Sequence, residues 1–317
     1  MTATTAPQQR PRLPRRALNG VLLLDKPVGL SSNDALIRAK RLYLAKKAGH
    51  TGTLDPLASG LLPLCFGEAT KFSQDLLEAD KTYEATMRLG IKTSTGDAEG
   101  EALDIRAVEC DPPAIERALA QFRGDIVQVP PMYSALKRDG KPLYEYARAG
   151  QTVEREGRHV TIHALELIAC ALPDVTFRVT CSKGTYVRTL AEDIGQVLGC
   201  GAHLIALRRT AVGALTLEQA VTLDALSDAT EAERDGWLQP VDALLSTFPA
   251  VQLDAEATRR FLHGQRLRLA DLKLDNKEAL SASRARVYAA EANRLLGIAK
   301  IGDGVLSPER LVVTAAD

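Results

Sequence analysis

The chain has 317 residues, of which 45% are hydrophobic and 25% are charged, a composition typical of a globular protein with room for two domains. Its 40 basic and 40 acidic residues cancel, so composition gives no sign of a nucleic-acid-binding protein, although basic surfaces can still form locally. No apolar run approaches the roughly 20 residues that span a bilayer, and the N-terminus lacks the apolar block of a signal peptide. We therefore expect a cytoplasmic protein without a membrane segment.

The five cysteines are odd in number, widely spaced and without a Cys-x-x-Cys pair. A disulfide framework or a zinc site would need paired or clustered cysteines. We therefore expect reduced and mostly buried thiols.

The N-terminal part of the chain begins with residues 1–18, which are rich in Pro, Thr, Gln and Arg and predict a disordered tail. The apolar run 20–24 predicts a buried strand. Ser31 or Ser32 can then cap a helix that we expect to reach Lys46-Lys47, where cations suit the helix dipole.

A polar stretch follows at 49–60, too rich in Gly and Thr for a helix and too interrupted by Gly and Pro for a central strand. It carries His50 and Asp55 five positions apart and then enters an apolar segment. A polar loop held against buried structure is a common mount for a reactive carboxylate. An ordinary turn formed by Asp55 and Pro56 also fits this stretch.

The middle of the chain predicts alternating elements joined by polar turns. We expect a helix to about residue 77, a half-buried strand at 81–89, a polar turn at 95–100, a helix that opens at Pro112-Pro113 and closes at Gly124, an irregular segment at 128–137 and a short helix at 142–148. In the last two segments Tyr144 and Tyr146 lie among lysines and arginines, a pattern that suits RNA contact and equally an ordinary surface excursion.

The second half predicts strands at 158–167, 174–181 and 203–211, with a helix between the last two that stops at Gly199. A weakly helical acidic stretch over 217–245 ends the first domain, and we place the boundary near residue 247. Beyond it, a helix at 254–262 and short runs at 285–289, 295–301 and 311–313 have the spacing of a small β-barrel.

Six stretches of the sequence match motifs of one known protein family, and they occur in the same order as in that family. They are 49–60, 67–72, 81–83, 132–146, 181–188 and 207–209. Together they resemble the bacterial tRNA pseudouridine-55 synthases from about residue 19 to the end, and the segment from Phe248 resembles the PUA RNA-binding barrel. The resemblance implies an α+β fold: a catalytic domain at 19–247 with a mixed or antiparallel sheet flanked by helices and an RNA-gripping insertion at about 131–158, followed by a small β-barrel-like PUA domain at 248–317.

The reaction that this resemblance implies is the isomerisation of uridine 55 to pseudouridine in the TΨC arm of tRNA. The uracil is detached from C1′ of the ribose, rotated and reattached through C5. Asp55 matches the family's catalytic aspartate, and Arg188 matches the arginine that keeps it charged. Tyr83 matches the tyrosine that stacks on the target base and accepts the C5 proton.

The target uridine lies inside a folded arm, so the nucleotide must be flipped out at a cost of about a few kcal/mol. His50 matches the residue expected to enter the vacated stack, and Leu207 matches the apolar wall of the uracil pocket. Four further residues match family positions near the site without an assigned role: Lys26, Lys71, Asp97 and Tyr186.

The resemblance also sets expectations for partners. The isomerisation is redox-neutral and the sequence holds no ligand cluster, so we expect neither a cofactor nor a metal. The partner is the T stem-loop of tRNA, bound by a monomer without guide RNA, with assistance to tRNA folding as a further activity. We also expect the 137–158 excursion to form a basic surface that faces the Asp55 pocket.

Two alternatives remain. One is a related guide-RNA-dependent synthase, against which the long 132–158 excursion speaks, because that segment grips RNA directly in the stand-alone family. The other is a non-catalytic RNA-binding or RNA-folding protein, against which the joint presence of Asp55, Tyr83 and Arg188 speaks.

Overall fold

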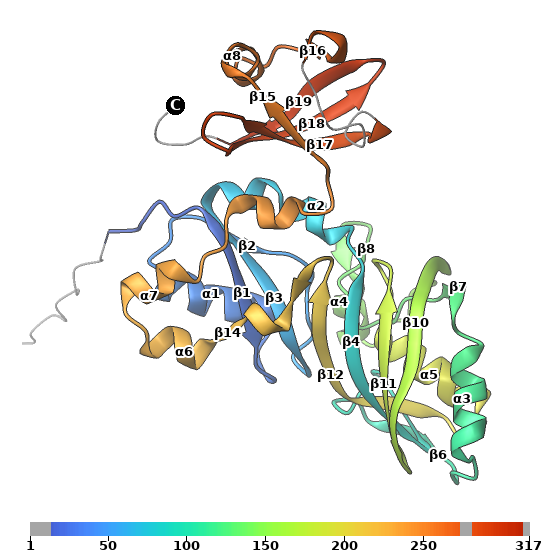
Figure 1. Ribbon diagram of the computed structural model, residues 1–317. Helices are drawn as coiled ribbons and strands as arrows, with labels where there is room; N and C mark the ends of the chain where they lie inside the picture. Colours follow the sequence, from blue (N-terminus) through green and yellow to red (C-terminus); the bar gives the residue numbers. More distant parts are fainter. Residues whose placement is uncertain (1–13, 273–280, 313–317) are drawn as a thin grey trace, which may run out of the picture.

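The computed structural model describes residues 14–272 and 281–312, which form one large sheet, a smaller C-terminal sheet and two short hairpins (Figure 1). The large sheet contains β1 (Gly20–Lys26), β2 (Ala48–His50), β3 (Ala58–Phe66), β4 (Lys81–Leu89), β7 (Gly124–Gln128), β10 (Arg158–Ala171), β11 (Asp174–Cys181), β12 (Ala202–Val212), β13 (Leu215–Thr216) and β14 (Val221–Thr222). Its main order is β14-β1-β3-β12-β4-β11-β10-β7, with β2 added on β3 and β13 on β12. The pairs β1–β14 and β3–β12 are parallel and the others antiparallel, so the sheet is mixed, as expected.

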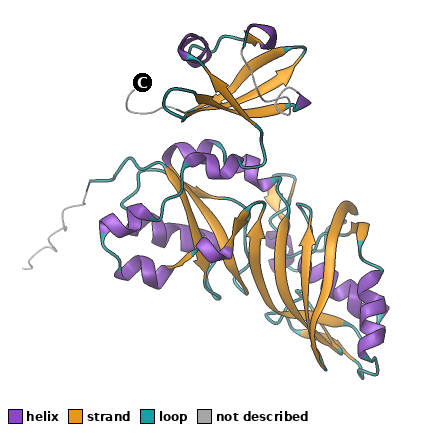
Figure 2. Cartoon of the chain, in the orientation of Figure 1, coloured by secondary structure: helices purple, strands orange, loops and turns teal. Residues whose placement is uncertain are grey.

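Helices cover both ends of this sheet (Figure 2). The helical elements before residue 247 are α1 (Ser32–Leu42), η1 (Gly67–Lys71), α2 (Ser73–Leu77), α3 (Pro112–Ala120), α4 (Leu143–Arg148), α5 (Val187–Val197), η2 (Leu217–Gln219), α6 (Leu223–Asp228), α7 (Glu231–Gly236) and η3 (Val241–Leu245). The hairpins are β5 (Ile91–Thr93) with β6 (Ala102–Ile105), and β8 (Lys137–Arg138) with β9 (Lys141–Pro142). None of the helices in the described ranges is long and apolar enough to cross a membrane.

Strand β1 shows why a continuous apolar run marks a buried strand. Leu22 and Leu24 pack into the cluster that contains α1 and α6, whereas Val21 and Leu23 pack into a second cluster on the opposite face. All four side chains are at most 1% exposed. Burial of each such side chain stabilises the fold by about 1.5–3 kcal/mol, so both faces of this end of the sheet are core.

Helix α1 is shorter than the sequence suggests. Ser31 caps it by accepting a hydrogen bond from the Asp34 backbone N–H at 3.1 Å. The helix ends at Leu42, and Leu44 adopts a left-handed conformation with φ 50°. Its last-turn cations are therefore Lys40 and Arg41, and the expectation that it reaches Lys46-Lys47 is wrong.

The residues that follow the helix pair with the N-terminal segment. Arg16 exchanges backbone hydrogen bonds with Leu44 and Lys46, and its side chain pairs with Asp235. Order therefore begins before residue 19, and residues 14–18 do not belong to the expected disordered tail. Residues 1–13 of that tail lie outside the described part of the chain.

The stretch 49–60 also departs from the expected irregular loop. Ala48–His50 is a strand, and residues 58–60 begin β3, which lies inside the sheet. Pro63 is tolerated there because β12 pairs only with residues 58–60 and β2 only with residues 64–66. The missing N–H of Pro63 thus falls between two partner strands, and the true loop is confined to residues 51–57.

The C-terminal unit is a curled five-stranded sheet, as expected for a PUA-like domain. Its elements are β15 (Ala250–Leu253), α8 (Ala255–Leu262), β16 (Leu267–Arg268), η4 (Leu269–Asp271), β17 (Arg284–Ala289), β18 (Arg294–Gly302) and β19 (Val305–Leu311), with strand order β15-β17-β18-β19-β16. The expected strand at 311–313 is misplaced: β19 ends at Leu311, and Val313 lies outside the described residues.

Asp75 joins this unit to the large sheet. Its carboxylate is 4% exposed and lies 2.8 Å from Arg284 Nη2 and 3.2 Å from Arg310 Nη1. Arg310 also donates to the Lys71 carbonyl at 2.8 Å, and Lys71 Nζ donates to the Leu311 carbonyl at 3.1 Å. The C-terminal sheet is thus docked beside α2 (Figure 1).

Candidate active site

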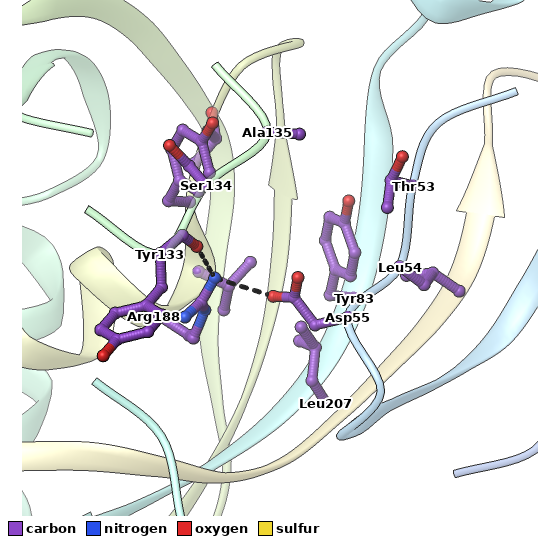
Figure 3. Close-up of a pocket in the computed structure, with 12 residues that line it drawn as sticks. Thr53, Leu54, Asp55, Tyr83, Tyr133, Ser134, Ala135, Arg188 and Leu207 are labelled. Carbon is purple, nitrogen blue, oxygen red and sulfur yellow. Dashed lines mark hydrogen bonds and ion pairs between the residues drawn. The ribbon is translucent and has the colours of Figure 1, made fainter. Parts of the chain in front are cut away.

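A cavity of about 180 Å³ opens on the large sheet beside the 51–57 loop (Figure 3). It is lined by Thr53, Leu54, Asp55, Tyr83, Tyr133, Ser134, Ala135, Thr185, Tyr186, Val187, Arg188 and Leu207. These residues come from five separate segments: the loop, β4, β12, the start of α5 with its preceding turn, and the 133–135 segment. The cavity therefore exists only in the folded chain.

The loop that carries Asp55 is held at several points. Ser32 Oγ accepts from the Leu54 N–H at 2.8 Å and donates to the Leu54 carbonyl at 3.0 Å. The Ala58 N–H donates to the Asp55 carbonyl at 3.0 Å, so Asp55 does begin a turn, which was the alternative interpretation of this stretch. The turn leaves the carboxylate free to point into the cavity, where Figure 3 shows it facing Arg188.

Arg188 is the centre of the polar network. Its Nη2 lies 3.0 Å from Asp55 Oδ2 and donates to the Tyr133 carbonyl at 2.8 Å. Its Nη1 lies 3.2 Å from Asp97 Oδ2 and donates to the Thr95 carbonyl at 3.0 Å. One buried guanidinium therefore joins two carboxylates and two backbone carbonyls, an arrangement that fixes its direction as well as its charge.

Tyr83 and Leu207 flank Asp55 on the sheet side of the cavity (Figure 3). They lie on neighbouring antiparallel strands, with Tyr83 opposite Arg209 and Leu207 opposite Ala85. Burial raises the pKa of the Tyr83 hydroxyl, so the phenol keeps its proton at neutral pH. The two side chains offer an aromatic ring and an apolar surface to anything that enters.

Lys26 and His50 lie close behind the loop. Lys26 is fully buried and donates to the carbonyls of Pro27 and Leu30 at 2.8 and 2.7 Å. Burial lowers its pKa to about 8, while the nearby Asp55 carboxylate opposes that shift. Burial and Arg209 also lower the pKa of His50, which is therefore neutral at pH 7.

The structure brings most of the expected residues together, with one exception. Asp55, Tyr83, Arg188, Leu207 and Tyr186 line the cavity, and three more adjoin it: Asp97 through Arg188, Lys26 through its proximity to Asp55, and His50 on the strand that enters the loop. Lys71 lies elsewhere. Its ammonium binds Glu68 at 2.6 Å and the Leu311 carbonyl at the junction with the C-terminal sheet.

Residues that the sequence did not single out also belong to the site. The Tyr133 carbonyl and the 133–135 segment form one wall, and Thr53 and Leu54 form another. Arg209 lies beneath the loop and is only 1% exposed. Its place on the same face as Leu207 could have been found from the strand alternation, since the two residues are two positions apart, whereas its register opposite Tyr83 is visible only in the structure.

Within the 137–158 excursion, two tyrosine rings form cation–π contacts with basic side chains of the same segment. Lys141 Nζ lies 4.6 Å from the Tyr146 ring centroid, and the Arg148 guanidinium lies 5.4 Å from that of Tyr144. Such cation–π pairs are each worth about 0.5–1 kcal/mol at exposed sites. They pre-arrange flat, positively charged surfaces, and their contact with RNA stays a prediction.

Solved structures define the class to which this fold belongs. The chain superposes on one chain of "Crystal Structure of a Cbf5-Nop10-Gar1 Complex" with a TM-score of 0.71 at 27% identity, covering 92% of this chain and 84% of the other. It matches one chain of "Structure of H/ACA RNP bound to a substrate RNA containing 2'-deoxyuridine" with a TM-score of 0.71 at 26% identity, covering 94% and 86%. Together with the family model that matches residues 40–187, described as TruB family pseudouridylate synthase (N terminal domain), these neighbours identify the fold as that of a pseudouridine synthase.

Sequence comparisons narrow the class. Residues 40–187 match the model described as TruB family pseudouridylate synthase (N terminal domain), residues 188–246 match tRNA pseudouridylate synthase B C-terminal domain, and residues 249–312 match Pseudouridine synthase II TruB, C-terminal. The "tRNA pseudouridine synthase B" of Burkholderia lata is 79% identical, covering 99% of this chain and 96% of that protein. That of Cupriavidus taiwanensis is 67% identical, covering 95% and 96%. The chain belongs to the TruB family of pseudouridine synthases.

Proposed function

We propose that this protein converts uridine 55 in the T arm of tRNA to pseudouridine, as a monomer and without a guide RNA. The observation that carries the proposal is the Asp55 carboxylate, fixed at 3.0 Å from the buried Arg188 at the edge of a cavity walled by an aromatic and an apolar side chain. Membership of the family and the printed names of its relatives support tRNA as the substrate.

Asp55 is suited to act as the nucleophile because it is accessible and is paired with a buried cation. Its side chain is 44% exposed, whereas its partner Arg188 is 7% exposed. A nearby cation favours the charged form of a carboxylate, also when a bound substrate shields that carboxylate from water. In the proposed reaction the C1′–N1 bond breaks, the uracil rotates and a C1′–C5 bond forms, while C5 loses one proton and N1 gains one.

Tyr83 supports the base and the proton transfer. Its ring offers a stacking surface, and Leu207 closes the cavity from the next strand. Because burial raises its pKa, Tyr83 accepts the C5 proton in its deprotonated form, whose share grows as the pH rises, and then passes that proton on. The residue therefore acts as a relay for a proton that ends on N1.

The nucleotide must leave the folded T arm to reach this cavity. Flipping costs about a few kcal/mol, which contacts on the protein side must offset. We assign His50, neutral and next to the loop, to the space that the flipped base vacates. We assign the insertion at about 131–158 and the C-terminal domain at 248–317 to tRNA binding.

A guide-RNA-dependent reaction is the competing function, because the structural neighbours include H/ACA complexes. A single assay separates the two. Purified protein is mixed with an unmodified tRNA transcript, with no other RNA, and with the same transcript carrying cytidine at position 55. We expect pseudouridine at position 55 of the first transcript and none in the second. No pseudouridine in either, or pseudouridine at another position, would contradict the proposal.

A further inference from the structure

Arg209 is a buried cation beneath the loop that carries Asp55. It is 1% exposed, and its guanidinium donates from Nε to the Leu61 carbonyl at 2.8 Å and from Nη2 to the Gly52 carbonyl at 3.0 Å. Within residues 14–272 and 281–312, no carboxylate forms an ion pair with it. The two acceptors named above are neutral backbone groups.

Such a residue is costly for the fold. Removing an ionised group from water costs several kcal/mol unless an opposite charge and well-aligned hydrogen bonds compensate. An apolar side chain at this position could be buried without this desolvation cost. The charge at Arg209 is therefore retained for what it holds in place rather than for stability.

The two carbonyls show what is held. Leu61 belongs to β3, whereas Gly52 belongs to the loop, three residues before Asp55. The planar fork of the guanidinium thus ties the loop to the sheet at two fixed points, which the single charge of a lysine cannot do. Gly52 has φ 70°, and a Cβ there would lie 3.3 Å from Arg209 Nη1, so the loop approaches the guanidinium closely.

The same side chain also faces Tyr83. Arg209 lies directly opposite Tyr83 on β4, where cross-strand side chains are neighbours on one face of the sheet. Its positive charge lowers the pKa of the Tyr83 hydroxyl against the larger raising effect of burial. The other charged or titratable groups near this hydroxyl, the Cys181 thiol on β11 and the Asp55 carboxylate, act in the opposite direction.

Arg209 is not among the residues that line the cavity. We propose that Arg209 is a positioning residue that sets, from behind the pocket, both the loop carrying Asp55 and the hydroxyl of Tyr83. The inference rests on the proposed function, since it gives a role to a residue that does not touch the substrate. It adds a single group that aligns the nucleophile with the proton relay.

Two consequences follow. Loss of Arg209 slows the chemical step and leaves tRNA affinity nearly unchanged, because a misplaced loop disturbs reaction geometry rather than the binding surface. Loss of the cation also raises the pKa of Tyr83 further, so the rise of the rate with pH moves to higher pH. A residue that only stabilised the fold would change neither quantity in the folded enzyme.

The test measures single-turnover pseudouridine formation against pH, tRNA dissociation constants and unfolding for Arg209→Gln and Arg209→Lys. The neighbouring Arg208→Gln is the matched control, because Arg208 points to the other face and pairs with Asp25 at 2.7 Å. A double-mutant cycle with Tyr83→Phe reports whether Arg209 acts through Tyr83.

We expect Arg209→Gln to lower the rate constant by roughly tenfold to hundredfold, with an upward shift of the pH profile, and to cost less in the Tyr83→Phe background. If Arg209→Gln does not fold, Arg209→Lys is expected to show a smaller loss in the same direction. A rate per folded molecule equal to that of Arg208→Gln, or full additivity with Tyr83→Phe, would overturn the inference. An inactive unmutated protein would instead overturn the proposed function.

Discussion

Arg188 and Asp55 form an ion pair whose two members differ sixfold in exposure, 7% for the arginine side chain and 44% for the aspartate. The buried partner is immobilised by Asp97 and two carbonyls, and the exposed partner faces the cavity. The arrangement separates an anchor from a group free to react. A symmetric surface pair would be worth about 0–1 kcal/mol and would fix nothing.

The first prediction concerns this anchor. Arg188→Lys keeps one positive charge but cannot reach Asp55, Asp97 and both carbonyls at once. We expect the single-turnover rate to fall by about a hundredfold. Arg178→Lys is the matched control, since Arg178 is 45% exposed and pairs with Glu84 at 2.7 Å away from the cavity. Equal rates for the two variants would show that the anchor is dispensable.

The second prediction concerns pH and the buried Lys26. Its pKa is about 8 in the folded protein against an ordinary 10.5, so the unfolded chain binds more protons between these values. Burial of the Lys26 charge therefore lowers the free energy of unfolding by its full amount below pH 8. This destabilisation decreases as the pH rises from 8 to 10.5 and is absent above that range. Relative to Lys26→Met, the free energy of unfolding of the unmutated protein should rise by about 1.4 kcal/mol per pH unit in this window. Urea unfolding of both proteins measures it, and parallel curves would refute the assignment.

The third prediction concerns the close contact of β3 and β12. Gly60 has φ 98°, and a Cβ there would lie 2.3 Å from the Arg209 carbonyl oxygen. Gly60→Ala must push the two strands apart, and we expect it to cost at least about 3 kcal/mol. Gly124 has φ 91° with no atom within 4 Å of such a Cβ, so Gly124→Ala should cost only the backbone strain of about 1–2 kcal/mol. Similar denaturation midpoints for the two variants would show that a Cβ at position 60 does not clash with the Arg209 carbonyl.

The fourth prediction concerns domain docking through Asp75. Asp75→Asn removes the charge that Arg284 and Arg310 share at the junction. A loosened C-terminal sheet should weaken binding of full-length tRNA by roughly tenfold while the rate with an isolated T stem-loop stays unchanged. Asp271→Asn, an exposed change in the same sheet unit, is the control. A proportional loss with both RNAs would place the effect in the active site instead.

The strands and helices with strong apolar periodicity were predictable from sequence. Strands β1, β4 and β11 follow the expected ranges closely, because β1 and β11 each bury one face completely and β4 buries one face except for the partly buried Tyr83. Strand β3 was not recognised, because Gly60 and Pro63 contradict local strand propensity. Only the arrangement of its neighbours, β12 on one stretch and β2 on the next, makes both residues acceptable.

The candidate site was predictable where a motif match carried it and unpredictable where burial decided it. Asp55, Tyr83 and Arg188 come from distant segments, and the cavity that unites them agrees with their expected association. Arg209 was missed because arginine is rarely buried without a partner. Lys71 matched a family position, but sequence gives no direction in space, and its side chain lies at the domain junction.

The most direct test of the account is the activity of Asp55→Asn on an unmodified tRNA transcript. The change keeps the size of the side chain and can still accept a hydrogen bond from Arg188, but it removes the nucleophilic charge. The account predicts an unchanged tRNA dissociation constant and pseudouridine formation at position 55 reduced by at least about ten-thousandfold. Pseudouridine formation at the rate of the unmutated protein would contradict it.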